Sequence, residues 1–212
     1  MSSAPLTLAM RLLLGLGALL LLVTYWVPVW RIDLFAPQYP EGLQMTIWLD
    51  HLSGNVDSIN GLNHYIGMRS IDENMFPEFK VLPYVVGALA GWGLLAAALG
   101  RRWAVGVWLT ALLVFLAAAM VDFYRWGYDY GHNLDEHAAI RIEGMTYQPP
   151  LIGYKQLLNF EAYSLPSYGA YLIAGATLLA ALVLWLSRRR KTVGSAPAVP
   201  LPSHAGVVRN QA

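Results

Sequence analysis

The sequence has no cysteine and little charge. Of its 212 residues, 13% are Asp, Glu, Lys or Arg, about half the usual share of a soluble domain. The absence of cysteine excludes disulfides, thiolate metal sites, iron–sulfur clusters and cysteine catalysis. Low charge together with 57% apolar residues argues against a disordered chain, a nucleic-acid-binding module and an ordinary soluble enzyme. This composition favours an integral membrane protein.

Four apolar stretches are long enough to cross a bilayer, which takes about 20 helical residues. The first is too long for a signal-peptide core. It is followed by the aromatic residues Tyr25, Trp26 and Trp30 rather than by a cleavage site, so we interpret it as a retained anchor. The predicted division is the N-terminus and first span at 1–30, an outer segment at 31–80, spans at 81–100 and 103–121, a second outer segment at 122–161, a fourth span at 162–187 and a disordered tail at 188–212.

Charge is segregated between the two sides of the expected membrane. The side with both termini holds eight basic residues and no acidic residue. All 13 acidic residues and the other six basic ones fall in the two outer segments, which gives these a net charge of −7. The positive-inside rule therefore predicts a multi-pass membrane protein with both termini in the cytoplasm and the two outer segments in the periplasm or outside the cell. The acidic outer surface suits cations, although the same charges also serve solubility and topology.

The outer segments are longer than simple connections need, and we expect them to fold together. Residues 43–50 alternate with period two and predict a half-buried strand, and a shorter alternation at 138–143 predicts its partner. Residues 55–68 predict a short helix with one apolar face. The expected fold is an all-α integral membrane protein of four transmembrane helices with a small mixed extracytoplasmic cap.

Spans two and four share a sequence pattern. Leu82-Pro83 precedes the second span and Leu165-Pro166 precedes the fourth, and a Gly-x-x-Leu-Leu-Ala-Ala stretch follows in both. This pattern suggests a tandem duplication of a helix–loop–helix unit. Chance similarity between helices rich in Leu and Ala is the alternative.

Histidines and methionines of the outer segments are the candidate metal ligands, because imidazole and thioether without thiolate suit copper better than zinc or iron. His64 and Met68 are four residues apart and would share one face of a helix. We expect His132 or His137 to complete the site, with nearby acidic residues orienting the imidazoles. Gly67 is expected to end the helix or to allow a close backbone approach. The alternative is a polar interfacial histidine beside a core methionine.

Asn63, Asp122 and Arg125 are expected to have structural or interfacial roles. Asp122 and Arg125 are three residues apart at the outer end of the third span, and pairing would lower the cost of placing charge there. No histidine lies in the apolar interior of a span, which excludes haem held by two histidines within the bundle. No acidic residue lies within a span either, which disfavours a pump or transporter.

Three stretches carry a family resemblance. Asn60–Met68, Asp122–Leu134 and Gln148-Pro149-Pro150-Leu151-Ile152-Gly153, with Asn159-Phe160, resemble a family of small bacterial four-helix membrane proteins associated with nitrous-oxide reductase maturation and copper delivery. The resemblance covers about residues 25–175. It implies an accessory role in periplasmic copper handling without catalytic activity, and it carries over no metal ligands.

The sequence thus predicts an accessory protein that helps to assemble or supply a copper-containing respiratory enzyme. Its expected partners are the lipid bilayer and a periplasmic or membrane respiratory protein, with copper as the expected ligand and no nucleic acid. One alternative is a structural or anchoring subunit of a respiratory complex without a metal of its own. Another is an enzyme with its site in the cap.

Overall fold

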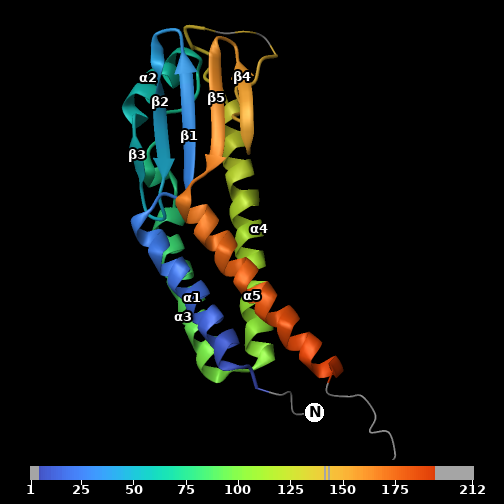
Figure 1. Ribbon diagram of the computed structural model, residues 1–212. Coiled ribbons are helices and arrows are strands. Elements are labelled where there is room, and N and C mark those ends of the chain that lie inside the picture. Colours follow the sequence, from blue (N-terminus) through green and yellow to red (C-terminus); the bar gives the residue numbers. More distant parts are fainter. Residues whose placement is uncertain (1–4, 141, 143, 194–212) are drawn as a thin grey trace, which may run out of the picture.

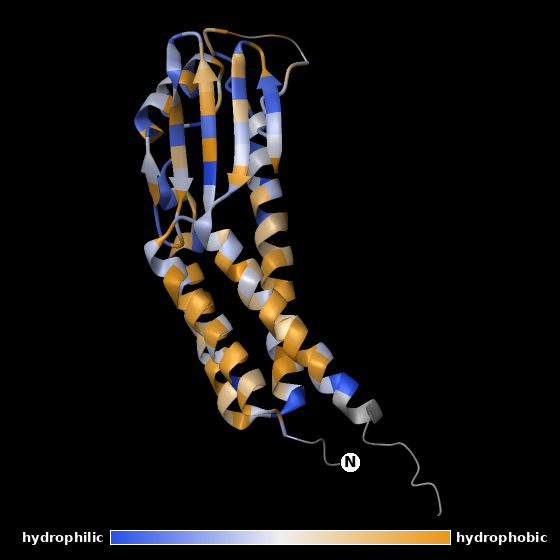
Figure 2. Cartoon of the chain, in the orientation of Figure 1, coloured by the Kyte–Doolittle hydropathy of each residue, from blue (hydrophilic) through white to orange (hydrophobic). Residues whose placement is uncertain are grey.

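The protein consists of a long helical bundle with a sheet-containing cap at one end (Figure 1). The computed structural model describes residues 5–140, 142 and 144–193. Four helices are long and apolar enough to cross a membrane, and Figure 2 shows most of their length in the bundle coloured as hydrophobic. This is the architecture of a multi-pass membrane protein. The four helices are α1 (Leu8–Val23), α3 (Glu78–Leu99), α4 (Arg102–His132) and α5 (Tyr168–Val193).

The bundle is held together by an apolar core. Helix α1 packs on α3 and α5, and α4 packs on the same two helices. Trp108 of α4 is completely buried at its centre, and its indole N–H donates to the carbonyl oxygen of Leu89 at 2.9 Å. A Cβ atom on Gly93 would lie 2.5 Å from the Trp108 ring. The close approach of α3 to this ring therefore requires glycine.

The bounds of α4 and α5 differ from the predicted spans. Helix α4 continues from the predicted end at residue 121 to His132, because Trp126 and Tyr130 on the added turns pack into the cap core. Helix α5 starts at Tyr168 rather than at residue 162, since β5 occupies the preceding residues as far as Pro166. It also includes 188–193, which we assigned to the tail. Residues 194–212 of that predicted disordered tail lie outside the described residues.

A five-stranded antiparallel sheet forms the cap, in the order β3-β2-β1-β5-β4. Its presence makes the fold mixed α/β and corrects the expected all-α class. Strands β1 and β5 pair with Trp30 opposite Pro166 and so join the two outer segments. The strands are β1 (Trp30–Ala36), β2 (Tyr39–Ile47), β3 (Leu52–Gly54), β4 (Gly153–Leu157) and β5 (Phe160–Pro166).

The predicted strand at 43–50 exists in part, as the second half of β2. Its predicted partner is wrong, because β2 pairs with β1 and β3. Residues 138–140 and 142 are not in a strand, and positions 141 and 143 lie outside the described residues. The amide of Ile140 instead donates to the carbonyl oxygen of Tyr65 at 2.9 Å, which ties this segment to a helix.

One face of the sheet is covered and the other is open. Helix α2 (Val56–Tyr65), the short η2 (Glu73–Met75) and the upper part of α4 lie on the covered face, behind the sheet in Figure 1. Helix α2 confirms the short helix predicted at 55–68, with Ile59 and Leu62 buried on its apolar face. A second apolar core, separate from that of the bundle, lies between these elements.

The structure does not reflect the suggested tandem repeat at the two prolines that precede the matching stretches. Pro83 lies inside α3, whereas Pro166 is the last residue of β5. The two positions therefore occupy different kinds of structure, and the shared pattern gives no structural equivalence at this point.

Candidate functional site

The end of α2 is fixed by Gly67, as the sequence predicted. Its φ of +78° lies in the left-handed region that favours glycine. The carbonyl oxygen of Asn63 accepts bonds from the amides of Ile66 and Met68 at 3.2 and 2.9 Å. A Cβ atom on Gly67 would lie 2.9 Å from the carbonyl oxygen of Asp135. Gly67 therefore both ends the helix and allows a close backbone approach.

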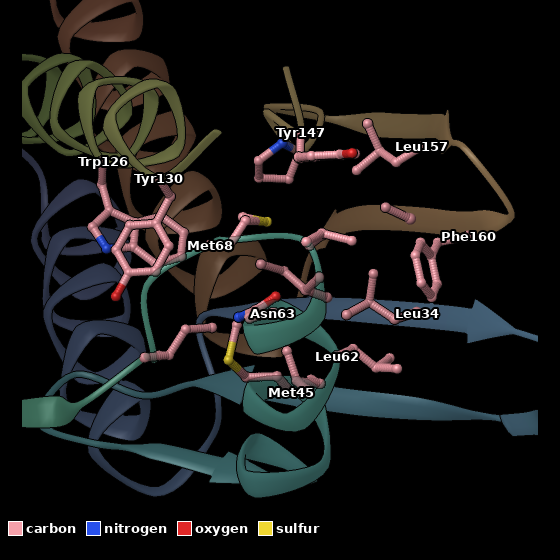
Figure 3. A pocket seen from close by; sticks show the side chains of 16 residues that line it. Leu34, Met45, Leu62, Asn63, Met68, Trp126, Tyr130, Tyr147, Leu157 and Phe160 are labelled. Carbon is pink, nitrogen blue, oxygen red and sulfur yellow. The ribbon is translucent and has the colours of Figure 1, made fainter. Parts of the chain in front are cut away.

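This turn separates His64 from Met68. Helix α2 ends at Tyr65, so Met68 does not continue the helical face on which His64 lies. The side chain of Met68 lines a cavity inside the cap (Figure 3), whereas His64 is exposed. The expectation that the two residues share one face is therefore wrong.

His64 and His137 instead flank Asp135. The amide of His137 donates to a carboxylate oxygen of Asp135 at 2.8 Å, and the His137 imidazole lies 3.3 Å from the same oxygen. The backbone N–H of His137, then its side chain, lower the pKa of the Asp135 carboxyl, and the charge of His64 adds to this effect. Asp135 is also anchored by its own amide, which donates to the carbonyl oxygen of Gly67 at 2.8 Å.

His132 lies apart from this pair, at the end of α4. Its ring stacks on Tyr128 with centroids 3.9 Å apart, and its Nδ1 lies 2.8 Å from the carbonyl oxygen of Tyr128. In the part of the chain that the structure describes, no group of three or more His, Cys, Asp or Glu side chains is placed to hold a metal ion. The metal site stays a prediction; of its four expected ligands, His137 contacts Asp135 and His64 acts on the same carboxyl through its charge.

The three expected structural residues divide into two kinds. Asn63 is buried, with 7% of its surface exposed, whereas Asp122 and Arg125 are exposed on α4. The expected Asp122–Arg125 pair is not among the ion pairs of the described residues. Those pairs are Arg31–Asp33, Arg69–Asp129, Asp50–His51 and Asp135–His137.

A cavity of about 70 Å³ lies inside the cap, between the covered face of the sheet, α2, α4 and residues 147–149 (Figure 3). None of its lining residues is charged. Three residues that line this cavity carry a buried side-chain atom with no hydrogen-bond partner among the described residues: Nδ2 of Asn63, Nε1 of Trp126 and the hydroxyl of Tyr147. By contrast, the hydroxyl of Tyr130, also at the cavity, donates to the carbonyl oxygen of Ser70 at 2.9 Å.

The position of Tyr147 in the cavity wall depends on one glycine of α4, Gly131. The amide of Tyr147 donates to the carbonyl oxygen of Gly131 at 2.9 Å. A Cβ atom on Gly131 would lie 2.2 Å from the Gln148 backbone. The absence of a side chain at Gly131 therefore lets residues 147–148 cross α4 in direct contact and places Tyr147, which is 1% exposed, against the cavity.

Sequence reasoning did not find this cavity. Asn63 could have been recognised from the sequence as a buried polar residue, because it is an amide next to Leu62 on the buried side of a short helix. Trp126 and Tyr147 could not be recognised in this way, since aromatic residues near a membrane boundary are typical of an interfacial belt. Comparison with known proteins adds no further assignment, because no family model, curated protein or solved structure matches the chain.

Proposed function

We propose that this membrane protein is an accessory protein of the bacterial inner membrane that helps to assemble or supply a copper-containing respiratory enzyme. Both termini lie in the cytoplasm in this proposal, and the cap faces the periplasm. The acidic outer segments, with their net charge of −7, would raise the local concentration of cations. The family resemblance of three stretches of the cap supports the copper assignment.

One observation carries the proposal: two backbone hydrogen bonds join the end of α2, next to His64, to the segment that contains His137. The amide of Asp135 bonds to Gly67 and that of Ile140 bonds to Tyr65, at 2.8 and 2.9 Å. Segments about 70 residues apart in the sequence thereby meet at Asp135. Imidazole and carboxylate groups are ligands that copper accepts, and the three side chains would have to move together to hold an ion, because among the described residues they form no ready metal site.

The chemistry of these ligands suits transfer of the ion rather than its storage. Without thiolate, a surface site of imidazole and carboxylate groups is open to exchange with a partner's ligands. The Asp135 carboxylate bonded to His137 would orient this ring, as acidic neighbours of metal-bound imidazoles do. The His137 side chain is 93% exposed, so a partner protein has access to it.

Copper competition with a chromophoric chelator tests this proposal on the purified full-length protein. We expect His64→Ala and His137→Ala each to weaken copper binding at least about ten-fold, as loss of one ligand does. Met68→Leu and His132→Ala serve as matched controls and should leave binding unchanged. A wild type that binds no copper would refute the copper assignment, and equal losses in all four variants would refute the pairing of His64 with His137.

The proposed topology has its own test. Alkaline phosphatase is active only outside the cytoplasm, so we expect low activity when it is fused after Lys191. Fusion after Leu157, in the cap, should give high activity. The reverse pattern would place the cap in the cytoplasm and remove the basis for a periplasmic role.

A second candidate function is that of an anchoring subunit, and the open face of the sheet favours it. Phe35, Tyr154 and Tyr163 form an aromatic cluster there, with ring centroids 5.9 Å apart for Phe35 and Tyr163 and 4.9 Å apart for Tyr154 and Tyr163. Phe35 and Tyr154 are 39% and 51% exposed. Exposed aromatic clusters are typical of protein interfaces.

Native electrophoresis of membranes solubilised in mild detergent tests the anchoring function. We expect the wild type to migrate in a larger complex that Phe35→Ser with Tyr154→Ser disrupts. Tyr65→Ser is the matched control, because Tyr65 is 57% exposed on α2 but lies outside the aromatic cluster. Migration of the wild type as a single chain would contradict an anchoring role.

A further inference from the structure

The cap cavity gathers most of the unpaired buried polar side-chain atoms in the described part of the chain. Of four such atoms, three belong to residues that line it. Asn63 and Tyr147 are more than nine-tenths buried. A buried polar atom without a partner costs about 1–3 kcal/mol, so three at one small cavity indicate that a partner is bound there during function.

The walls of the cavity limit the charge of that partner. None of the lining residues is charged, and burying an unpaired ion among apolar groups is unfavourable by several kcal/mol or more. Between the three polar atoms the walls are apolar, with Met68, Phe160 and Leu34 among them (Figure 3). An uncharged molecule with an apolar body fits these walls.

Ordered water alone fits less well. A buried water molecule needs two to four polar partners. Figure 3 shows Trp126 and Tyr147 on different sides of the cavity, with apolar side chains between them. A water molecule bonded to one of these side chains is therefore short of further partners. Replacing such weakly held water by an apolar group favours binding.

The volume limits the size of the bound group. The cavity measures about 70 Å³, roughly half of the ~150 Å³ cavity that admits benzene. Benzene has six heavy atoms, so a compact group of about three or four heavy atoms fits this smaller cavity. Because the cavity is partly open to the surface, a longer molecule can insert one end.

We propose that the cavity binds a small uncharged carbonyl compound, or the carbonyl-bearing end of a longer one. The indole N–H of Trp126 can only donate a hydrogen bond, so the occupant must supply an acceptor. Its oxygen accepts from Trp126 or from the hydroxyl of Tyr147, and its apolar body lies against Met68 and Phe160. The amide of Asn63 both donates and accepts and pairs with a second polar atom. This site is independent of the proposed copper function.

Stability measurements provide a test that needs no ligand. Tyr147→Phe and Asn63→Leu each remove a polar group without a partner and nearly keep the side-chain volume. We expect the apparent Tm of both variants to equal that of the wild type or to exceed it by about 1–5 °C. Tyr130→Phe is the matched control, because it removes a bonded hydroxyl and should lower the Tm.

Binding is tested with the full-length protein in nanodiscs of synthetic lipids. Acetone, with four heavy atoms, represents a carbonyl compound that arrives from water. Isobutene has the same shape without the acceptor and is the control ligand. 2-Undecanone, placed in the bilayer, carries the same carbonyl end on a longer molecule that arrives from the membrane. Saturation-transfer NMR titrations and the ligand-induced shift in Tm report binding of each.

We expect one of the two carbonyl probes to bind saturably, and isobutene to bind at least about five-fold more weakly. Tyr147→Phe and Trp126→Phe should each weaken binding of that probe by about five-fold. Ala162→Leu should abolish it, because Ala162 is fully buried at the cavity and the larger side chain fills the space. Tyr65→Phe should leave binding unchanged, because Tyr65 is exposed on α2 and does not line the cavity.

Two results would overturn the proposal. The first is that neither carbonyl probe binds, or that the probe binds Tyr147→Phe and Trp126→Phe as well as the wild type. The second is a fall in Tm for Tyr147→Phe and Asn63→Leu as large as for Tyr130→Phe, which would identify the cavity as a site of structural water. Both results can be obtained even if Ala162→Leu fails to fold.

Discussion

In the bundle, buried polar side chains find partners within the chain, whereas at the cap cavity three do not. Among the described residues, Trp108 bonds to Leu89 at 2.9 Å, Thr24 to Leu21 at 2.5 Å and Thr177 to Ile173 at 2.8 Å. Nε of Arg11 has no partner, but it lies at the end of the bundle and its guanidinium still donates to Ala98.

The difference follows from the surroundings of each region. Hydrocarbon offers no hydrogen bonds, so a polar atom in a transmembrane helix must be paired within the protein. The cap is under no such constraint, because a water molecule or a ligand can enter it. The nearly complete pairing in the bundle therefore reflects stability, and the incomplete pairing at one place in the cap supports the proposed binding site.

The largest effect is expected from breaking the bundle core at Trp108. We expect Trp108→Ala to destabilise the protein by about 3–5 kcal/mol, because it leaves a cavity and removes the hydrogen bond to Leu89. Trp103→Ala, at a position 53% exposed on the same helix, should cost less than about 1 kcal/mol. Reversible unfolding in mixed micelles measures both. Equal losses in the two variants would contradict a core centred on Trp108.

An intermediate effect is expected from a methyl group added at Gly131. Because its Cβ atom would lie 2.2 Å from the Gln148 backbone, Gly131→Ala should displace residues 147–148 and cost about 1–3 kcal/mol. Gly61→Ala is the control, since no atom lies within 4 Å of its Cβ position, and alanine favours a helix by about 1 kcal/mol. We therefore expect opposite signs of the change in unfolding free energy. Destabilisation by both would show that the crossing at α4 is not the cause.

Apolar patterning predicted the parts of the fold that depend on local sequence. The four spans were found because bilayer thickness sets their length, and α2 was found because Ile59 and Leu62 repeat with helical period. Gly67 was correctly assigned to the end of this helix. The all-α class was wrong because four of the five strands were not recognised. Strand β5 was hidden at the start of an apolar run that continues into α5.

The candidate site depended on contacts that single-sequence reasoning does not reach. The His64–Met68 pair assumed that the helix continues past Gly67, although the same glycine was expected to be able to end it. Met68 then lies at the cavity and His64 at the surface. The cavity needs Gly131 to admit Tyr147 beside Trp126. These residues come from α4 and from the segment that follows it, and no local pattern relates them.

A small effect is expected from the ion pair that links the loop after α2 to α4. Arg69 pairs with Asp129 at the surface, and its guanidinium lies 5.6 Å from the centre of the Tyr130 ring. Exposed pairs contribute about 0–1 kcal/mol. We expect a double-mutant cycle of Arg69→Leu and Asp129→Asn to give a coupling energy below about 1 kcal/mol. This coupling energy should decrease as the salt concentration rises. A larger coupling would mean that the cap is held by surface charge rather than by its apolar core.

The smallest effect concerns the protonation of Asp135. Because the amide of His137, its ring and the charge of His64 favour the ionised carboxylate, its pKa in the folded protein is lower than the ordinary value. Its contribution to stability is therefore complete above the ordinary Asp pKa of about 3.9 and is lost as the pH falls through the lowered value. Carboxyl NMR should show a titration midpoint below about 3.9. We expect His137→Ala to raise this midpoint in part, since the backbone N–H remains, and His64→Ala to raise it less. A midpoint that neither variant moves would mean that the two histidines do not flank Asp135, and the copper proposal would then lose its geometric support.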